Sequence, residues 1–186
     1  MDLRGNGKSD KPHIPEAYLN DAEAKDIMGI VSKLKIKSYS AVGYSRGSII
    51  VARLLVLDKR VNRAVLGGMG ADFTNPDWPR RIMFYEGLMG KPVPEVAGLI
   101  KYIKEADLDQ QALAYMQNGQ PSTSKEALAK INQKVLVISG TEDADNGSAK
   151  ELADLIPYSS LANVPGDHGG AVRTKEFAQA VVTFLM

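Results

Sequence analysis

The sequence has 186 residues, 44% of them hydrophobic, which is long enough for one sizeable core and short for two independent domains. Its 23 basic and 22 acidic residues give a net charge of +1, so charge gives no reason to expect binding to nucleic acid or to an anionic membrane. The absence of cysteine excludes disulfides and thiolate chemistry and is compatible with a cytoplasmic location.

The N-terminal segment MDLRGNGKSDKP lacks the apolar stretch of a signal peptide, and no apolar run reaches the roughly 18 residues of a membrane span. We therefore expect a soluble, cytoplasmic protein. The same segment contains GNGKS at residues 5–9, which is similar to the end of a phosphate-binding loop. The full pattern G-x-x-x-x-G-K-[ST] requires glycine at position 2, where Asp2 stands, so we interpret these residues as a turn.

The next part of the chain reads as alternating helices and strands. Residues 22–36 place Ile27, Ile30, Val31 and Leu34 at helical spacing, and SYSAVGY at 38–44 follows as a short apolar strand. A mostly apolar helix is expected over 46–60, and a second strand over 63–70.

Residues 72–130 differ from the rest, because Pro76, Pro79, Pro92, Pro94 and Pro121 separate short helical pieces. Regular structure returns with the buried strand KVLVISG at 134–140, followed by a helix at 148–156, a short segment at 159–164 and a C-terminal helix at 174–186. The alternation predicts an α/β fold with a mostly parallel sheet. We expect residues 1–71 and 131–186 to form its core and 72–130 to be an inserted helical cap.

A serine between two glycines marks the first strand-to-helix turn. AVGYSRGS at 41–48 contains Ser45 in a G-x-S-x-G spacing. Glycines at these positions allow a sharp turn that exposes the serine hydroxyl at the carboxyl end of the strand. Ser45 is therefore a candidate nucleophile, although the spacing alone also occurs in ordinary glycine-rich loops.

A serine nucleophile requires a base, and the sequence has two histidines. His13 lies between two prolines and reads as an ordinary surface residue, whereas His168 lies in a glycine-flanked loop before the last helix. The base in turn needs a carboxylate from a neighbouring strand end. We assign Asp143, three residues beyond Gly140, with Glu142 and Asp145 as competitors.

Four segments together resemble successive motifs of the α/β-hydrolase family: DLRGNGKSDKP, VGYSRGS, KVLVISGTEDADNG and PGDHGGAV. The order serine, acid, histidine is also that of this family. The resemblance implies that Ser45 is the nucleophile, His168 the general base and acid, and Asp143 its orienting acid. It further implies that the backbone N–H of Arg46 is one oxyanion donor. No His, Asp and Glu cluster in the sequence has a convincing metal-ligand spacing, so we expect neither a metal nor a cofactor.

The sequence departs from the family in one respect. In the hydrolases that it resembles, the D-x-R-G segment follows four strands and a helix, and an earlier loop supplies the second oxyanion N–H. We therefore expect an N-terminally truncated α/β-hydrolase with weak activity, since loss of one donor typically lowers kcat by about 10²- to 10³-fold. The strand before Ser45 would then form an exposed edge, through which we expect a homodimer.

These features favour a serine hydrolase that cleaves small carboxylic esters through an acyl-enzyme on Ser45. Two alternatives stay open. The first is a catalytically impaired hydrolase-fold protein that acts as a scaffold or binding protein. The second is a cofactor-free perhydrolase or haloperoxidase, which would use the same three residues.

Overall fold

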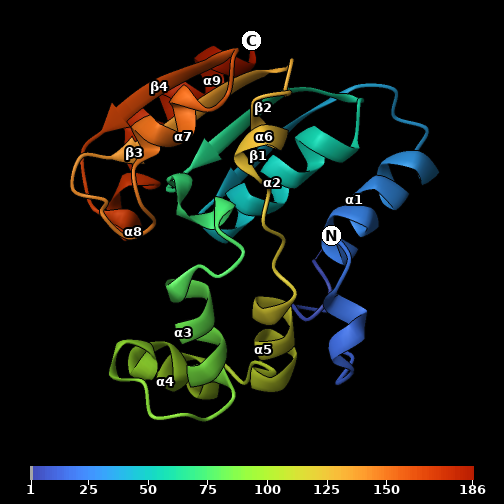
Figure 1. Cartoon of the computed structure of the whole chain (residues 1–186), viewed down its shortest axis with the longest axis vertical. Helices are drawn as coiled ribbons and strands as arrows, with labels where there is room; N and C mark the ends of the chain where they lie inside the picture. Colours follow the sequence, from blue (N-terminus) through green and yellow to red (C-terminus); the bar gives the residue numbers. More distant parts are fainter. Residues whose placement is uncertain (1) are drawn as a thin grey trace. The chain divides into compact units, whose positions relative to one another are not determined.

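The computed structural model describes residues 2–186, in which strands and helices alternate over much of the chain (Figure 1). The strands are β1 (Tyr39–Tyr44), β2 (Val61–Gly67), β3 (Lys134–Gly140) and β4 (Ser159–Val164). The α-helices are α1 (Ala22–Lys33), α2 (Arg46–Leu57), α3 (Pro79–Leu88), α4 (Ala97–Glu105), α5 (Gln110–Asn118), α6 (Lys125–Leu128), α7 (Ala149–Asp154), α8 (His168–Ala171) and α9 (Lys175–Leu185). Short 3-10 helices are η1 (Pro15–Tyr18), η2 (Ala71–Thr74) and η3 (Pro94–Val96).

The residues group into two compact units, each described by itself. One unit contains residues 30–76 and 122–186, and the other contains residues 2–29 and 77–121. Of the helices in residues 2–186, none combines the length and the apolar character that crossing a bilayer requires.

The first unit is built on a parallel sheet. Its strands lie in the order β1-β2-β3-β4, and all three neighbouring pairs are parallel. The register places Val42 beside Val65, Val65 beside Leu136, and Leu136 beside Ser160. The parallel α/β fold expected from the sequence is therefore confirmed.

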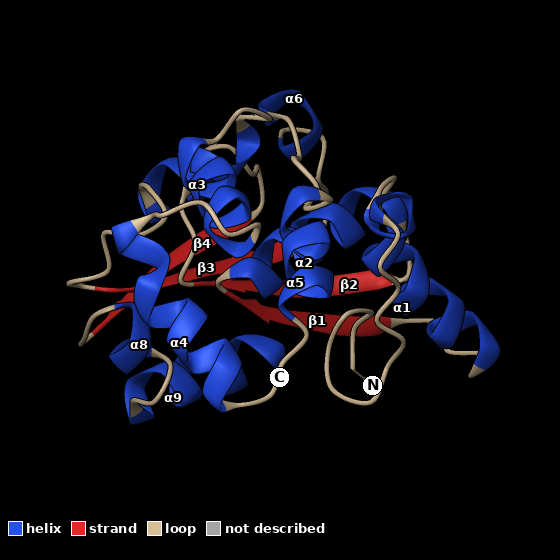
Figure 2. Cartoon of the chain, turned by 90° about the horizontal axis from the view of Figure 1, so that it is seen from below, coloured by secondary structure: helices blue, strands red, loops and turns tan. Residues whose placement is uncertain are grey.

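Helices cover both faces of this sheet. Every residue of β3 from Val135 to Gly140 is buried, as expected for a continuously apolar strand with neighbours on both sides. Figure 2 shows α2 and α9 on opposite sides of the sheet. On the side of α9, Val65, Leu136 and Ile138 pack in one cluster with Phe177. Because the sheet is parallel, the carboxyl ends of all four strands lie at one edge, where polar side chains can converge.

The second unit is helical. α3 packs against both α4 and α5, and α5 packs against η1. Tyr18 of η1 is 1% exposed and lies in a cluster with Ala112 and Met116 of α5. This packing explains why residues 2–29 group with 77–121. The boundaries expected from the sequence, with residues 1–71 in the core and 72–130 in a cap, stay a prediction.

Candidate active site

Ser45 lies at the turn between β1 and α2, where its backbone has φ 52° and ψ −124°. A positive φ is uncommon for a residue with a side chain and indicates strain that the surroundings must hold. The N–H of Ser45 donates a hydrogen bond of 2.8 Å to the carbonyl oxygen of Gly67 on β2. A Cβ atom at Gly43 would lie 2.3 Å from the carbonyl oxygen of Gly47, so only glycine fits there. The sharp turn predicted from the G-x-S-x-G spacing is therefore present.

The hydroxyl of Ser45 faces His168. Ser45 stands at the N-cap position of α2, and its Oγ lies 2.9 Å from Nε2 of His168. The two residues are 123 positions apart in the sequence and are brought together by the sheet. The structure therefore joins the serine to the histidine that the sequence assigned as its base.

His168 is the first residue of the short helix α8, whereas the sequence placed it in a loop. The difference arises at Asp167, whose carboxylate accepts a hydrogen bond of 2.7 Å from the N–H of Gly170 and so caps the helix. Two consecutive glycines after the histidine disfavour a helix in sequence-based reasoning, but the cap offsets this. The helical turn fixes the backbone that carries the imidazole.

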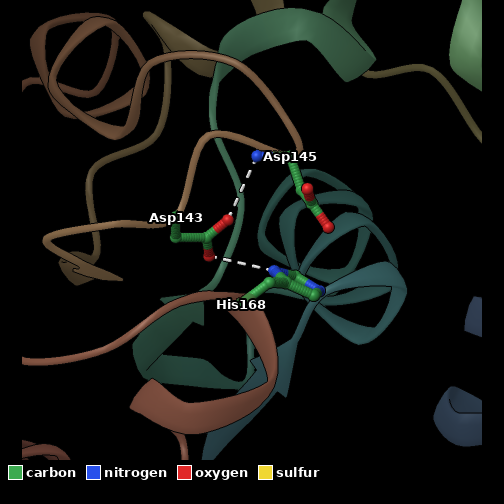
Figure 3. Close-up of side chains that lie close together, drawn as sticks. All are labelled: Asp143, Asp145 and His168. Atoms are coloured by element: carbon green, nitrogen blue, oxygen red, sulfur yellow. Dashed lines mark hydrogen bonds and ion pairs between the residues drawn. The ribbon is translucent and has the colours of Figure 1, made fainter.

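Asp143 is the carboxylate beside His168. Its Oδ2 faces Nδ1 of His168 (Figure 3) at a distance of 2.9 Å. The Asp143 side chain is only 3% exposed. Its other oxygen, Oδ1, accepts a hydrogen bond of 3.2 Å from the backbone N–H of Asp145. Glu142, one of the two competitors, is exposed. Among the three acidic residues that the sequence offered, the structure thus gives Asp143 both the burial and the contact.

The two hydrogen bonds of His168 fix where its protons lie. A carboxylate can only accept, so Nδ1 carries the proton that it donates to Asp143. In neutral imidazole, Nε2 then holds a lone pair and accepts the hydroxyl proton of Ser45. The arrangement is therefore ready to remove a proton from the serine.

Asp145 lies close to the same imidazole. Asp143, Asp145 and His168 each offer a ligand atom within 4.8 Å of the others, so in the described part of the chain these three could hold a metal ion (Figure 3). An imidazole nitrogen with carboxylate oxygens is a donor set that suits Zn²⁺. However, Nδ1 of His168 and Oδ2 of Asp143 already bond to each other, so a metal ion here would compete with that contact.

The remaining sequence candidates have clear positions. Arg46 is the first residue of α2, so its backbone N–H belongs to the first turn, where helix N–H groups point away from the helix body. His13 lies in the helical unit, where its Nε2 is 2.8 Å from Oδ2 of Asp109. The side chain of His13 is exposed in this contact, which agrees with its interpretation as an ordinary surface residue.

Sequence reasoning missed Tyr44, the residue that precedes the serine. Its hydroxyl donates a hydrogen bond of 2.5 Å to the backbone carbonyl oxygen of His168. Burial raises the pKa of the Tyr44 phenol, and the negative charges of Asp143, Asp167 and Asp145 raise this pKa further, so the hydroxyl keeps its proton. The only sequence signal was an aromatic residue inside the G-x-S-x-G spacing.

Comparisons with known proteins show the family of this chain. A sequence profile of the family described as the alpha/beta hydrolase fold matches residues 1–99, which is more than half of the 186 residues. No curated protein matches the sequence.

Solved structures of this fold are similar over nearly the whole chain. A bromoperoxidase from Bacillus anthracis is 24% identical, with a TM-score of 0.77 over 99% of this chain and 79% of its own. An esterase from Exiguobacterium antarcticum is 23% identical, with a TM-score of 0.76 over the same shares of the two chains, 99% and 79%. An enol-lactonase from Burkholderia xenovorans LB400 is 22% identical, with a TM-score of 0.77 over 99% of this chain and 78% of its own. At these identities the likeness concerns the fold.

Proposed function

Because the chain belongs to the alpha/beta hydrolase fold family, we propose that it is a serine hydrolase that cleaves small carboxylic esters through an acyl-enzyme on Ser45. The observation that carries the proposal is the continuous hydrogen-bonded series from Ser45 Oγ through His168 to Asp143, with both distances at 2.9 Å. This series lies at a strained turn, which is where a nucleophile of this family is expected.

In the first half-reaction, Nε2 of His168 takes the proton of the Ser45 hydroxyl while Oγ attacks the ester carbonyl carbon. The negative charge that develops on the carbonyl oxygen is stabilised by the backbone N–H of Arg46. The imidazolium then gives its proton to the alcohol oxygen as the carbon–oxygen bond breaks. The alcohol leaves, and the acyl group stays on Ser45 as an ester.

In the second half-reaction, Nε2 of His168 takes a proton from a water molecule, whose oxygen attacks the acyl carbon. The proton returns to Oγ as the bond to Ser45 breaks, so a carboxylic acid is released and the serine is regenerated. Through both steps, Asp143 keeps the proton on Nδ1 and stabilises the positively charged imidazolium. Its low exposure strengthens this interaction, because water screens buried charges less.

A second candidate function is a cofactor-free perhydrolase or haloperoxidase. It is favoured by the structural likeness to the bromoperoxidase from Bacillus anthracis, and it would use the same serine, histidine and aspartate. In this case hydrogen peroxide replaces water as the molecule that attacks the acyl carbon. Measuring halide oxidation with acetate and hydrogen peroxide, with and without bromide, distinguishes this function from simple ester hydrolysis.

A third possibility is a scaffold or binding protein in which the three residues are inherited and inactive. The experiment that separates it from the hydrolase is hydrolysis of p-nitrophenyl acetate and butyrate by the wild type and by Ser45→Ala. Ser40→Ala is a matched control, because Ser40 lies on the same strand and is exposed. A hydrolase loses its turnover only in Ser45→Ala, whereas three equal background rates would leave the scaffold as the better account.

A further inference from the structure

Tyr44 contacts His168 in two ways. Its hydroxyl donates the hydrogen bond of 2.5 Å to the carbonyl oxygen of His168. Its ring also lies beside the imidazole, with ring centroids 5.3 Å apart and an angle of 35° between the planes. Both contacts join positions 124 residues apart in the sequence, so they link β1 directly to the segment that carries the histidine.

The Tyr44 ring has a closely fitted site of its own. Phe177 of α9 contacts it edge-on at a centroid distance of 5.6 Å. On another side the ring lies against Gly67 and Gly68, where added Cβ atoms would come within 2.8 and 2.7 Å of ring carbons. The ring is therefore held in place without help from its hydroxyl. The direction of the hydroxyl follows from this packing.

Tyr44 is also the covalent neighbour of Ser45. Two hydrogen bonds and the covalent chain therefore form a closed ring of atoms. The ring runs from Ser45 Oγ to His168 Nε2 and on to the His168 backbone. It then crosses the hydrogen bond to the Tyr44 hydroxyl and returns to Ser45 along the chain. One rigid aromatic side chain thus sets the spacing between the backbone that carries the nucleophile and the backbone that carries the base. A shift of about 1 Å in such a spacing can lower a catalytic rate about 100-fold.

We propose that Tyr44 is a positioning residue, whose hydroxyl holds the backbone of His168 so that Nε2 stays within hydrogen-bonding distance of Ser45 Oγ. The inference rests on the proposed function for its effect on rate, but its effect on the placement of His168 is a property of the folded protein alone. Tyr44 itself donates no proton to the substrate. It acts through His168.

The variant Tyr44→Phe tests the role of the hydroxyl, because it keeps the ring that packs on Phe177 and the two glycines. Tyr39→Phe is the matched control: Tyr39 begins the same strand, and its hydroxyl donates a hydrogen bond of 3.0 Å to Asp58. For p-nitrophenyl butyrate we expect Tyr44→Phe to lower kcat about 10-fold, roughly the effect of one hydrogen bond, with KM nearly unchanged. Tyr39→Phe is expected to keep wild-type values of both. Equal kcat values in the two variants would overturn the proposal.

Nuclear magnetic resonance provides a readout that does not need turnover. The sequence has two histidines, so spectra of the imidazole ¹⁵N nuclei contain two sets of signals, and a His13→Gln variant assigns them. We expect the His168 signals to move or broaden in Tyr44→Phe and to stay in place in Tyr39→Phe. If the wild type is inactive but the His168 signals respond in this way, the hydrolase function fails while the positioning role stands. Unchanged His168 signals in Tyr44→Phe would overturn the positioning role whatever the activity.

The wild-type protein supplies a test that stands even if Tyr44→Phe does not fold. With ring centroids 5.3 Å apart, nuclear Overhauser effects are expected between the ring protons of Tyr44 and those of His168. Their observation supports the placement of the two rings. Their absence in a protein whose other ring contacts are visible would overturn it.

Discussion

The carbonyl oxygen of Gly47 lies so close to Gly43 that a Cβ atom at Gly43 would be only 2.3 Å from it. The end of strand β1 and the first turn of α2 therefore approach each other closely, and this approach is possible because Gly43 has no side chain. This approach bends the chain sharply between them, and Ser45 occupies the bend. The geometry of the candidate nucleophile Ser45 thus depends on the absence of a side chain at Gly43, two residues earlier.

This approach predicts opposite effects for the two glycines of the G-x-S-x-G spacing. Gly43→Ala forces backbone atoms apart, and we expect it to lower the free energy of unfolding by about 2 kcal/mol or more. Gly47→Ala places its Cβ in open space within a helix, so we expect a gain of up to about 1 kcal/mol from the better helix propensity of alanine. Urea unfolding of the two variants measures both values. Equal stabilities would show that the close approach does not hold the turn.

The choice between the two aspartates beside His168 can be tested by kinetics. Asp143→Asn removes the carboxylate that accepts the hydrogen bond from Nδ1 of His168, and we expect kcat/KM to fall about 10³- to 10⁴-fold. Asp145→Asn keeps the backbone N–H that bonds to Asp143, so we expect a change of less than about 10-fold. Ester hydrolysis by both variants gives the comparison. A larger loss in Asp145→Asn than in Asp143→Asn would reverse the assignment.

Asp58 predicts how stability depends on pH. Hydrogen bonds from the Arg60 side chain are the main cause that lowers the pKa of the nearly buried Asp58 carboxyl. Hydrogen bonds from the Arg60 backbone N–H and the Tyr39 hydroxyl lower this pKa further, whereas burial raises it. A carboxyl whose pKa is lower in the folded state stabilises the fold above its unfolded pKa, and this stability is lost as pH falls through the folded pKa. We therefore expect Asp58→Asn to be about 1 to 3 kcal/mol less stable at pH 7.

As pH falls below the pKa of the unfolded carboxyl, the stability difference between the wild type and Asp58→Asn should shrink. The wild-type carboxyl then becomes protonated and loses its charge, as the neutral Asn side chain has none. Thermal unfolding followed by circular dichroism between pH 3 and 7 measures this dependence. A difference that stays constant over the whole range would mean that Asp58 does not titrate as its contacts indicate.

The outer edge of β1 predicts association. Among the strands of residues 2–186, β1 pairs with β2 alone, and Val42 on this strand is 51% exposed. Edge strands of this kind pair readily with other strands, so we propose that two copies associate through β1. Light scattering at micromolar protein should give twice the mass of one chain, and Val42→Lys should give the single-chain mass. A wild type that is monomeric under these conditions would rule the interface out.

The strands and the serine turn could be predicted from the sequence because their signals are local. KVLVISG is continuously apolar over the residues that form β3, and the glycines around Ser45 need no distant partner to be recognised. The signal for His168 is local too, because its glycine-flanked position before the last helix distinguishes it from His13, which lies between two prolines. These features gave the fold class and the three residues that the structure brings together.

The features that the sequence left open or did not predict depend on contacts between distant residues. Its place three residues beyond Gly140 favoured Asp143 over Glu142 and Asp145 but left both open as competitors. The burial of Asp143 and its contact with His168 arise only when β3 and β4 are paired. The bond from Tyr44 to His168 spans 124 positions, and Tyr18 groups the N-terminal residues with α5 through side-chain packing. Helix α8 depends on a single capping carboxylate, which outweighs the two glycines beside it.

The most direct test of the account is the site of reaction with a fluorophosphonate probe, mapped by mass spectrometry of peptides from the labelled protein. The probe reacts with a serine only when a neighbouring base activates its hydroxyl. We predict one adduct, on the peptide that contains Ser45, absent from Ser45→Ala, strongly slowed in His168→Gln and unchanged in His13→Gln. Equal labelling of the wild type and Ser45→Ala, or no labelling of either, would contradict the claim that His168 activates Ser45.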